Sequence, residues 1–406
     1  MTGRREVAHV LRRLTFGPTA AEVDAAVRDG LPATVDRVLA PPGPVAYPSL
    51  PPVEKGERQA QAADAVAWWI GRMAAHGGNA AEKLTFFWHG LWATSVRKVR
   101  SAGLMLTQQK TFRTYGSGPT GPLVRAMLRD PALILWLDGQ RNTGKAPNEN
   151  LARESMELFT LGVGHYTEDD VKAAARVLTG WQVDRTAGTS RLAPRRHATG
   201  PVTLLGRTGP LDVDGYADLL VRHPQHVPFL AARVWLRYGG GGEAPASLAA
   251  AGNAVPAMLR ALALDPSFPR TAGQLVKQPV EWVAGAVRQL GVDPARAGRQ
   301  LQAGLRALGQ VPFRPPSVGG WPAGEAWLTT AACQARLRTG QALAALATAK
   351  TQELAEAAES DRLDALARLL VVDAWTDRTA TVLRPVAKDP RRLLAIGLAS
   401  PEYTVC

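Results

Sequence analysis

The sequence predicts a mainly α-helical protein, an irregular multi-helix bundle with long ordered loops and at most one small β-hairpin near residues 182–210. Apolar residues recur at three- and four-residue spacing through most of the 406 residues, which is the period of a helix. Thr19 and Thr167 are each followed three residues later by an acid, a pattern that marks helix starts. With 46% hydrophobic and 20% charged residues, the chain can also build a large buried core.

The same patterns give the expected elements in order. Helices are expected at 5–14, from Thr19 onward, and at 57–76, 79–96, 123–128, 132–137, 148–160, 167–180, 213–222, 226–238, 246–264, 271–290, 293–308, 324–349, 351–358, 360–371 and 389–399. Proline and glycine separate them in a connector at 41–53, a turn at 239–242 and a long loop at 311–324. Residues 182–210 lack helical periodicity, and 201–205 is their most strand-like part.

The chain length allows one large core or two packed lobes. We expect a single domain over 1–406, which could divide into an N-terminal lobe, 1–181, and a C-terminal lobe, 211–406. The basic loop 182–210 would then join the two lobes. No repeat of solenoid period is visible.

The composition argues against several classes of protein. Two cysteines, Cys333 and Cys406, cannot make a disulfide framework, and their spacing fits no metal site. The arginines near the N-terminus are not followed by the apolar segment of a secretory signal. No apolar run reaches the length of a membrane span. We therefore expect a soluble, cytoplasmic protein that does not contact a membrane.

The formal net charge of +13 comes mostly from arginine, and it reflects either an arginine-rich genome or a basic surface for an anionic partner. One cluster comprises Arg185, Arg191, Arg195, Arg196, His197 and Arg207, and another comprises Arg97, Lys98, Arg100, Lys110 and Arg113. Neither cluster is interleaved with the aromatic side chains that stack on bases. Binding of a polyanion is therefore an alternative, but nucleic acid is not the expected partner.

The helix expected at 148–160 concentrates polar side chains. Glu149, Arg153 and Glu157 form an i, i+4, i+8 ladder on one face, which is typical of a solvated, ion-paired surface. Asn148 and Asn150 add hydrogen-bonding groups at the helix start, where an anion is favoured. The face is thus either an ordinary surface or part of a polar site.

His89 lies in the segment FFWHGLW, on the helix expected at 79–96. It is either a core histidine with one hydrogen bond or an acid–base or metal-binding residue that faces Glu149, Glu154 or Glu157. Glutamates and a histidine from two helices are how helix bundles hold divalent metals, although the usual Glu-x-x-His spacing is absent. A divalent metal on Glu154, Glu157 and His89 is therefore a candidate. Lys277 and Glu281, four residues apart across Pro279, are expected to form a surface pair.

Several segments of the chain form a recognisable set: LRRLTFGPTAAEV, FFWHGLWATS, APNENLARESMELFTLGVGHYTEDDVKAAARVLTGW, LLGRTG, LVKQPVEWVAGAVRQLG, FRPPSVGGWPAGEAWL and LASPEY. Together they resemble the large bacterial family called domain of unknown function 1800, over residues 5–403. The resemblance implies a helical protein without an agreed activity. Many members look exported through a twin-arginine leader and are encoded beside a sulfatase- or phosphatase-like companion, which would be a partner protein. This chain lacks the leader, and it has Ala198 where the family commonly has an acid after the histidine.

The resemblance carries over these positions: His89, Asn148, Glu149, Asn150, Arg153, Glu154, Glu157, Trp181, His197, Lys277, Glu281, Trp321 and Trp327. We expect an enzyme that acts on an anionic or polyhydroxylated small molecule, as a hydrolase or oxidase that could depend on a divalent metal. Its acid–base groups would be Glu149, Glu154, Glu157 and His89. Its substrate-binding residues would be Asn148, Asn150, Arg153, Lys145, Trp181, His197, Arg196, Lys277 and Trp321. The alternatives are a non-catalytic binding or assembly protein with a buried ion-pair network, and a polyanion-binding protein.

Overall fold

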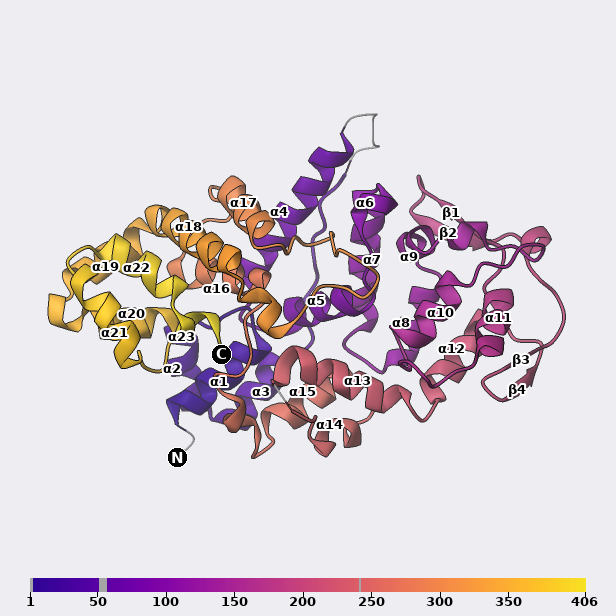
Figure 1. Ribbon diagram of the computed structural model, residues 1–406, viewed down its shortest axis with the longest axis horizontal. Helices are drawn as coiled ribbons and strands as arrows, with labels where there is room; N and C mark the ends of the chain where they lie inside the picture. Colours follow the sequence, from indigo (N-terminus) through magenta and orange to yellow (C-terminus); the bar gives the residue numbers. More distant parts are fainter. Residues whose placement is uncertain (1–2, 51–56, 241) are drawn as a thin grey trace.

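The computed structural model describes residues 3–50, 57–240 and 242–406. Over these residues the protein is mainly helical, as the sequence predicts. The molecule is elongated, with the helices of the C-terminal region at one end and the strands at the other (Figure 1). Two predicted loops are described only in part, because residues 51–53 of the connector and residue 241 of the glycine turn lie outside the described ranges.

The helices that precede the strands begin largely where the sequence predicts. They are α1 (Arg4–Leu14), α2 (Ala20–Asp29), α3 (Leu31–Val38), α4 (Arg58–His76), α5 (Ala81–Leu91), α6 (Val96–Val99), α7 (Ala102–Tyr115), α8 (Thr120–Leu128), α9 (Pro131–Trp136), α10 (Asn150–Glu157) and α11 (Glu168–Val177). Both predicted capping boxes form: Thr19 and Thr167 accept from the backbone N–H groups of Glu22 and Asp170, whose carboxylates accept in return.

The segment 181–209 forms two hairpins, where the sequence predicts at most one. Strand β1 (Trp181–Asp184) pairs antiparallel with β2 (Thr189–Leu192), and β3 (Val202–Leu204) pairs antiparallel with β4 (Arg207–Gly209). The second hairpin closes through Leu205 and Gly206, both with positive φ, as a two-residue turn between twisted strands requires. Each sheet has two strands, and both sheets lie at one end of the helical body (Figure 1).

The helices after the hairpins are often shorter than predicted. They are α12 (Val213–Arg222), α13 (His226–Val234), the π-helical segment η3 (Trp235–Gly239), α14 (Ala246–Ala250), α15 (Val255–Ala263), α16 (Pro279–Leu290), α17 (Gly298–Ala307), α18 (Thr330–Leu346), α19 (Thr348–Glu356), α20 (Arg362–Leu370), α21 (Asp377–Leu383), α22 (Pro390–Ala399) and α23 (Pro401–Thr404). Gly252, with φ of 81°, splits the helix predicted at 246–264. Pro279 sets the start of α16, because proline suits the first turn of a helix.

Helix α5 lies at the centre of the molecule and is buried on all sides (Figure 1). Leu84, Phe87 and Trp88 belong to a first core that includes α1 to α3 and α8 to α15, whereas Phe86 belongs to a second core that includes α4, α7 and α16 to α22. The helix is therefore covered on both sides, although it also carries Glu82, Lys83, Thr85 and His89. The polar side chains of α5 are therefore sealed inside the protein.

Side chains from before and after residues 182–210, such as Phe159 and Phe229, share the first core. The two lobes expected on either side of this loop stay a prediction. Among the described residues, no helix combines the length and apolar character that crossing a bilayer requires.

Candidate ligand-binding site

The polar ladder of α10 is an ion-paired surface. One guanidinium nitrogen of Arg153 lies 2.7 Å from Glu168 and the other lies 3.2 Å from Glu149, and all three side chains are substantially exposed. At the helix start, the Asn148 side chain accepts from the backbone N–H of Asn150. Exposed pairs of this kind contribute little to stability. Only the Glu149–Arg153 step of the predicted ladder forms, because Arg153 takes Glu168 and not Glu157 as its second partner.

The two other glutamates of α10 differ in their surroundings. Glu157 accepts a hydrogen bond from the hydroxyl of Tyr166, and burial together with the Glu157 charge raises the pKa of that hydroxyl to about 12. Burial and the neighbouring Glu157 charge raise the pKa of the Glu154 carboxyl. Within the described chain the Glu154 carboxylate has no hydrogen bond or ion pair. Of the predicted acid–base residues, Glu154 is the one left free to exchange a proton.

His89 is a sealed core residue. Its Nε2 accepts a hydrogen bond from the backbone N–H of Phe313 at 3.0 Å, and its ring packs against Trp69, Phe313 and Trp321. Burial lowers the pKa of His89 to about 3, so the ring stays neutral near pH 7. His89 thus holds the loop at 311–324 through Phe313. The carbonyl oxygen of Phe313 also accepts from the backbone N–H of Val96, which adds a second contact to this loop.

The metal site suggested by the sequence is not assembled. No group of three or more histidine, cysteine, aspartate or glutamate side chains is placed to hold a metal ion anywhere in residues 3–50, 57–240 or 242–406. Glu154, Glu157 and His89 are therefore not brought together. The Nε2 of His89 accepts from the backbone N–H of Phe313, and the Glu157 carboxylate accepts from the Tyr166 hydroxyl.

The basic loop anchors itself to the end that carries the hairpins. His197 Nδ1 lies 2.9 Å from the carbonyl oxygen of Thr179, and Arg196 donates to Gln182 and to the Gln140 carbonyl oxygen. The guanidinium of Arg129 stacks on the Trp181 ring at 5.7 Å. Lys145, also predicted to bind substrate, is exposed. The contacts of Trp181, Arg196 and His197 anchor the hairpin region, and neither these residues nor Lys145 line the pocket described next.

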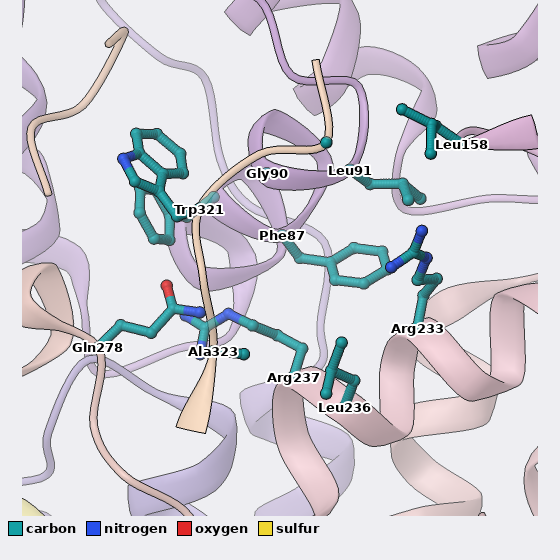
Figure 2. A pocket seen from close by; sticks show the side chains of 12 residues that line it. Phe87, Gly90, Leu91, Leu158, Arg233, Leu236, Arg237, Gln278, Trp321 and Ala323 are labelled. Carbon is teal, nitrogen blue, oxygen red and sulfur yellow. The ribbon is translucent and has the colours of Figure 1, made fainter. Parts of the chain in front are cut away.

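A pocket lies beside α5, beneath the loop that carries Trp321 (Figure 2). It encloses about 650 Å³ of space, part of it open to solvent. Its walls come from α5, the end of α10, the junction of α13 with η3, the start of α16 and the loop at 311–324. The lining residues are Phe86, Phe87, Gly90, Leu91, Leu158, Arg233, Leu236, Arg237, Gln278, Gly319, Trp321 and Ala323. Of the predicted site residues, Trp321 is the one that lines it.

The loop over the pocket is held close to α5. The Trp321 ring stacks on Phe86 with ring centroids 5.5 Å apart. Gly320 has φ of 81°, and a β-carbon there would lie only 2.4 Å from the backbone oxygen of Gly90. A residue without a side chain is therefore required at this approach. Trp321 is thereby placed as one wall of the pocket.

A buried ion network supports the pocket from behind. Glu281 lies 2.5 Å from Lys83 Nζ and 2.9 Å from Arg237, and all three side chains are at least nine-tenths buried. Burial alone would raise the pKa of Glu281, but the charges of Arg237 and Lys83 outweigh burial and lower it to about 2. The backbone N–H of Gln278 donates to the same carboxylate at 2.9 Å. Two cations thus share one carboxylate beneath the pocket.

The predicted surface pair of Lys277 with Glu281 is wrong. Glu281 is buried and pairs with Lys83 and Arg237, which come from distant segments. The Lys277 ammonium lies 3.9 Å from the centroid of the Tyr403 ring, and burial lowers its pKa to about 8. Helical spacing alone could not foresee this, because the competing partners are close only in the folded chain.

Two residues that line the pocket carry buried donors without acceptors among the described residues. Arg237 uses Nη1 for Glu281, and its buried Nη2 has no hydrogen-bond partner among the described residues. The buried Trp321 Nε1 likewise has none in the part of the chain that the structure describes. Arg233, four residues before Arg237, approaches the same pocket, and its guanidinium stacks on Phe229 and has no ion pair within the described ranges. Buried donors normally find partners, so this arrangement favours a ligand that accepts.

Sequence reasoning missed both pocket arginines. Arg233 and Arg237 are four residues apart on either side of Leu236, an otherwise unexplained leucine that is 50% exposed. Two cations and an exposed leucine within five residues were the available signal for a binding site on this helix. It was weak, because nothing in the local sequence indicates that the loop at 311–324 returns to this helix.

The sequence comparisons identify the family and nothing more. No curated protein and no solved structure matches the chain. The family model described as "Protein of unknown function (DUF1800)" matches residues 9–405. Because this match covers nearly the whole chain, the protein belongs to the DUF1800 family.

Proposed function

We propose that the protein binds a small organic anion in the pocket beneath Trp321, with the anionic group on the arginines and an apolar body on the aromatic floor. The observation that carries this proposal is the buried, unpartnered Nη2 of Arg237. A guanidinium held by one carboxylate still has donors in a fixed fork, which match carboxylate, phosphate or sulfate oxygens.

The charge balance around Arg237 supports an anionic ligand. Lys83 and Arg237 share the single carboxylate of Glu281, so Arg237 has no carboxylate of its own, while the C-terminal Cys406 also favours the charge on Lys83. Arg233 adds another cation at the pocket wall. Burial lowers the pKa of Arg233, as expected for a cation that would gain from a counter-charge. An anion between Arg233 and Arg237 would add a counter-charge for both.

The remaining walls select the rest of the ligand. Phe86, Phe87, Leu91 and Leu158 are apolar, and Trp321 adds an aromatic ring to the wall. Figure 2 shows Phe87 at the pocket centre, with Arg233 and Arg237 reaching in from the same helical segment. Pockets of this kind bury an apolar body and use a few polar groups for orientation. An aromatic or branched apolar acid therefore fits better than a sugar.

Calorimetric titration with phenylphosphonate, a stable aromatic anion, tests this proposal. Wild-type protein should bind it more tightly than benzyl alcohol, which lacks the charge, and more tightly than inorganic phosphate, which lacks the ring. Arg237→Lys keeps a cation for Glu281 but loses the free fork, and Arg233→Ala removes the unpaired cation. Each should weaken binding by about tenfold or more, since a hydrogen bond to a charged group contributes about 1.5–3 kcal/mol.

Arg222→Ala is the matched control, because Arg222 is exposed on α12 and its guanidinium has no ion pair among the described residues. It removes the same charge and should leave the affinity unchanged. Equal affinity for benzyl alcohol and phenylphosphonate would contradict the proposal. So would an affinity that Arg233→Ala and Arg237→Lys leave at the wild-type value.

A second candidate function is acid–base catalysis on the bound anion. It is favoured by Glu154, whose carboxylate is free, has a raised pKa and lies one helical turn before the pocket residue Leu158. In this case Glu154→Gln would abolish turnover of an aromatic phosphate or sulfate ester while leaving phenylphosphonate affinity unchanged. Failure of the wild-type protein to turn over any such ester would leave binding as the function.

A further inference from the structure

A second basic feature lies away from the pocket, where α4, α6, α17 and the residues around Arg314 meet. Two adjoining hollows, of about 980 and 550 Å³ including open solvent, share Gln59 and Arg314 in their walls. Five arginines line them: Arg58, Arg97, Arg100, Arg306 and Arg314. We call this combined space the arginine cleft. None of its lining residues is acidic.

The five cleft arginines have no counter-charge among the described residues, unlike the arginines that form the ion pairs of the protein. Arginines such as Arg72, Arg113 and Arg288 pair with carboxylates at 2.6–2.9 Å. For the five cleft guanidinium groups there is no ion pair or hydrogen bond within the described ranges, and the buried Nε of Arg314 is among the unpartnered atoms. Glu57 is the N-cap residue of α4 and Asp64 lies on this helix, but both are exposed and neither pairs with a cleft arginine.

The arginines repel one another across the cleft. Burial and the charges of Arg97 and Arg306 lower the pKa of Arg314. Burial and the charges of Arg58 and Arg100 likewise lower the pKa of Arg185, whose guanidinium donates to the Val99 carbonyl oxygen beside the cleft. Like charges gathered from several elements cost free energy unless an anion sits among them.

The backbone holds two of these arginines in place by unusual means. Arg100 is itself left-handed, with φ of 56°, at the end of α6, and Phe313 is left-handed, with φ of 64°, directly before Arg314. Only three other non-glycine residues in the described chain have a positive φ. Phe313 is tied to His89 and to Val96 by backbone hydrogen bonds. Strained conformations that persist in this way often belong to functional sites.

From this arrangement we infer that the arginine cleft binds a small polyanion carrying several phosphate or sulfate groups. The cleft has no aromatic side chain in its walls for stacking bases, so a nucleic acid is disfavoured. It also lacks the aromatic side chains that line the Trp321 pocket, so it favours an aromatic monoanion less than that pocket does. Several guanidinium forks around one hollow match several anionic groups on one compact molecule.

Calorimetry with tripolyphosphate tests the inference, with sucrose octasulfate and inorganic phosphate as comparison ligands. Wild-type protein should bind tripolyphosphate at least about tenfold more tightly than inorganic phosphate. The double variant Arg97→Ala/Arg100→Ala should lose about tenfold or more of this affinity, yet keep its affinity for phenylphosphonate. Because both side chains are exposed and unpaired, this variant should fold as well as wild type.

The control is Arg28→Ala/Arg222→Ala, which removes the same charge from two exposed sites elsewhere. Equal weakening in the cleft and control variants would mean that net charge alone attracts the ligand, and it would overturn the inference. Tighter binding of a single-stranded oligonucleotide than of tripolyphosphate would also overturn it. A preference for tripolyphosphate or for sucrose octasulfate supports it and distinguishes a phosphate source from a sulfate source.

Discussion

The role of His89 leads to the sharpest prediction. In the folded protein its ring is sealed and its pKa is about 3, whereas in the unfolded chain the pKa returns to 6.5. The unfolded state therefore takes up a proton below pH 6.5 that the folded state cannot accept. The contribution of the neutral His89 to the free energy of unfolding is therefore full above pH 6.5, and it is lost progressively as the pH falls toward 3.

The size of this effect follows from the two pKa values. At pH 5 the lost stability is RT ln(1 + 10^1.5), which is about 2 kcal/mol. The variant His89→Gln offers an amide oxygen in place of Nε2 as acceptor for the Phe313 N–H, but it cannot be protonated. The free energy of unfolding of wild type minus that of the variant should be constant from pH 7 to 8 and fall by about 2 kcal/mol at pH 5.

Urea unfolding of both proteins at pH 8, 7, 6 and 5, followed by tryptophan fluorescence, measures this difference. Other buried titrating groups, such as His9 and Asp130, are present in both proteins and cancel. Parallel curves for the two proteins would refute the reasoning. They would mean that His89 titrates in the folded state and is free to serve as an acid or base.

Further variants test other contacts. Glu281→Gln should destabilise the protein by about 3–5 kcal/mol in urea unfolding, because Lys83 and Arg237 stay buried without the Glu281 counter-charge. A loss as small as that of the exposed Arg153→Ala would show that the Glu281 ion pairs do not stabilise the fold. Gly320→Ala should cost at least about 1–2 kcal/mol and weaken phenylphosphonate binding, because a β-carbon meets the Gly90 oxygen; unchanged affinity would show that this loop does not shape the pocket. Burial raises the pKa of Asp130 to about 7, so its ionisation opposes folding as the pH rises. The free energy of unfolding of wild type relative to that of Asp130→Asn should therefore fall by roughly 2–3 kcal/mol from pH 5 to 8. A difference that stays constant over this range would show that the pKa of Asp130 is not raised.

Local signals predicted much of the fold, and their failures have physical causes. Capping boxes at Thr19 and Thr167 and the proline at 279 fix helix starts through interactions within a few residues. Helix α7 was missed because Gln108 and Gln109 occupy its buried face and interrupt the apolar stripe. Gln108 is tolerated there because it donates to Thr94 and to Asp130, partners that only the fold supplies.

The candidate site could be predicted only in part. Four of the segments that carry the family resemblance meet at the pocket, contributing Phe86 and Phe87, Leu158, Gln278, and Trp321. The sequence drew attention to Trp321, but it placed the reactive centre on α10, because charged residues are more conspicuous there. The cations that matter at the pocket, Arg233 and Arg237, are ordinary in sequence. Their significance depends on which carboxylates are already used, and ion pairing between distant segments cannot be deduced from spacing.

The arginine cleft was likewise visible in sequence only as an undivided cluster. Two residues of that sequence cluster lie outside the cleft and are already paired. Lys98 pairs with Asp138 at 2.7 Å, and Arg113 pairs with the buried Glu82 at 2.6 Å. Arg97 and Arg100 remain unpaired and face Arg314 from a distant loop. Folding thus separates structural cations from cations that are available to a ligand.

The central claim is that Arg237 presents a free donor to an anion in the pocket beneath Trp321. A crystal structure of the protein with phenylphosphonate tests it most directly. We expect a phosphonate oxygen within hydrogen-bonding distance of Arg237 Nη2, with the phenyl ring against Phe86 or Phe87. Density for the ligand in the arginine cleft alone, or an empty pocket at saturating phenylphosphonate, would contradict the claim.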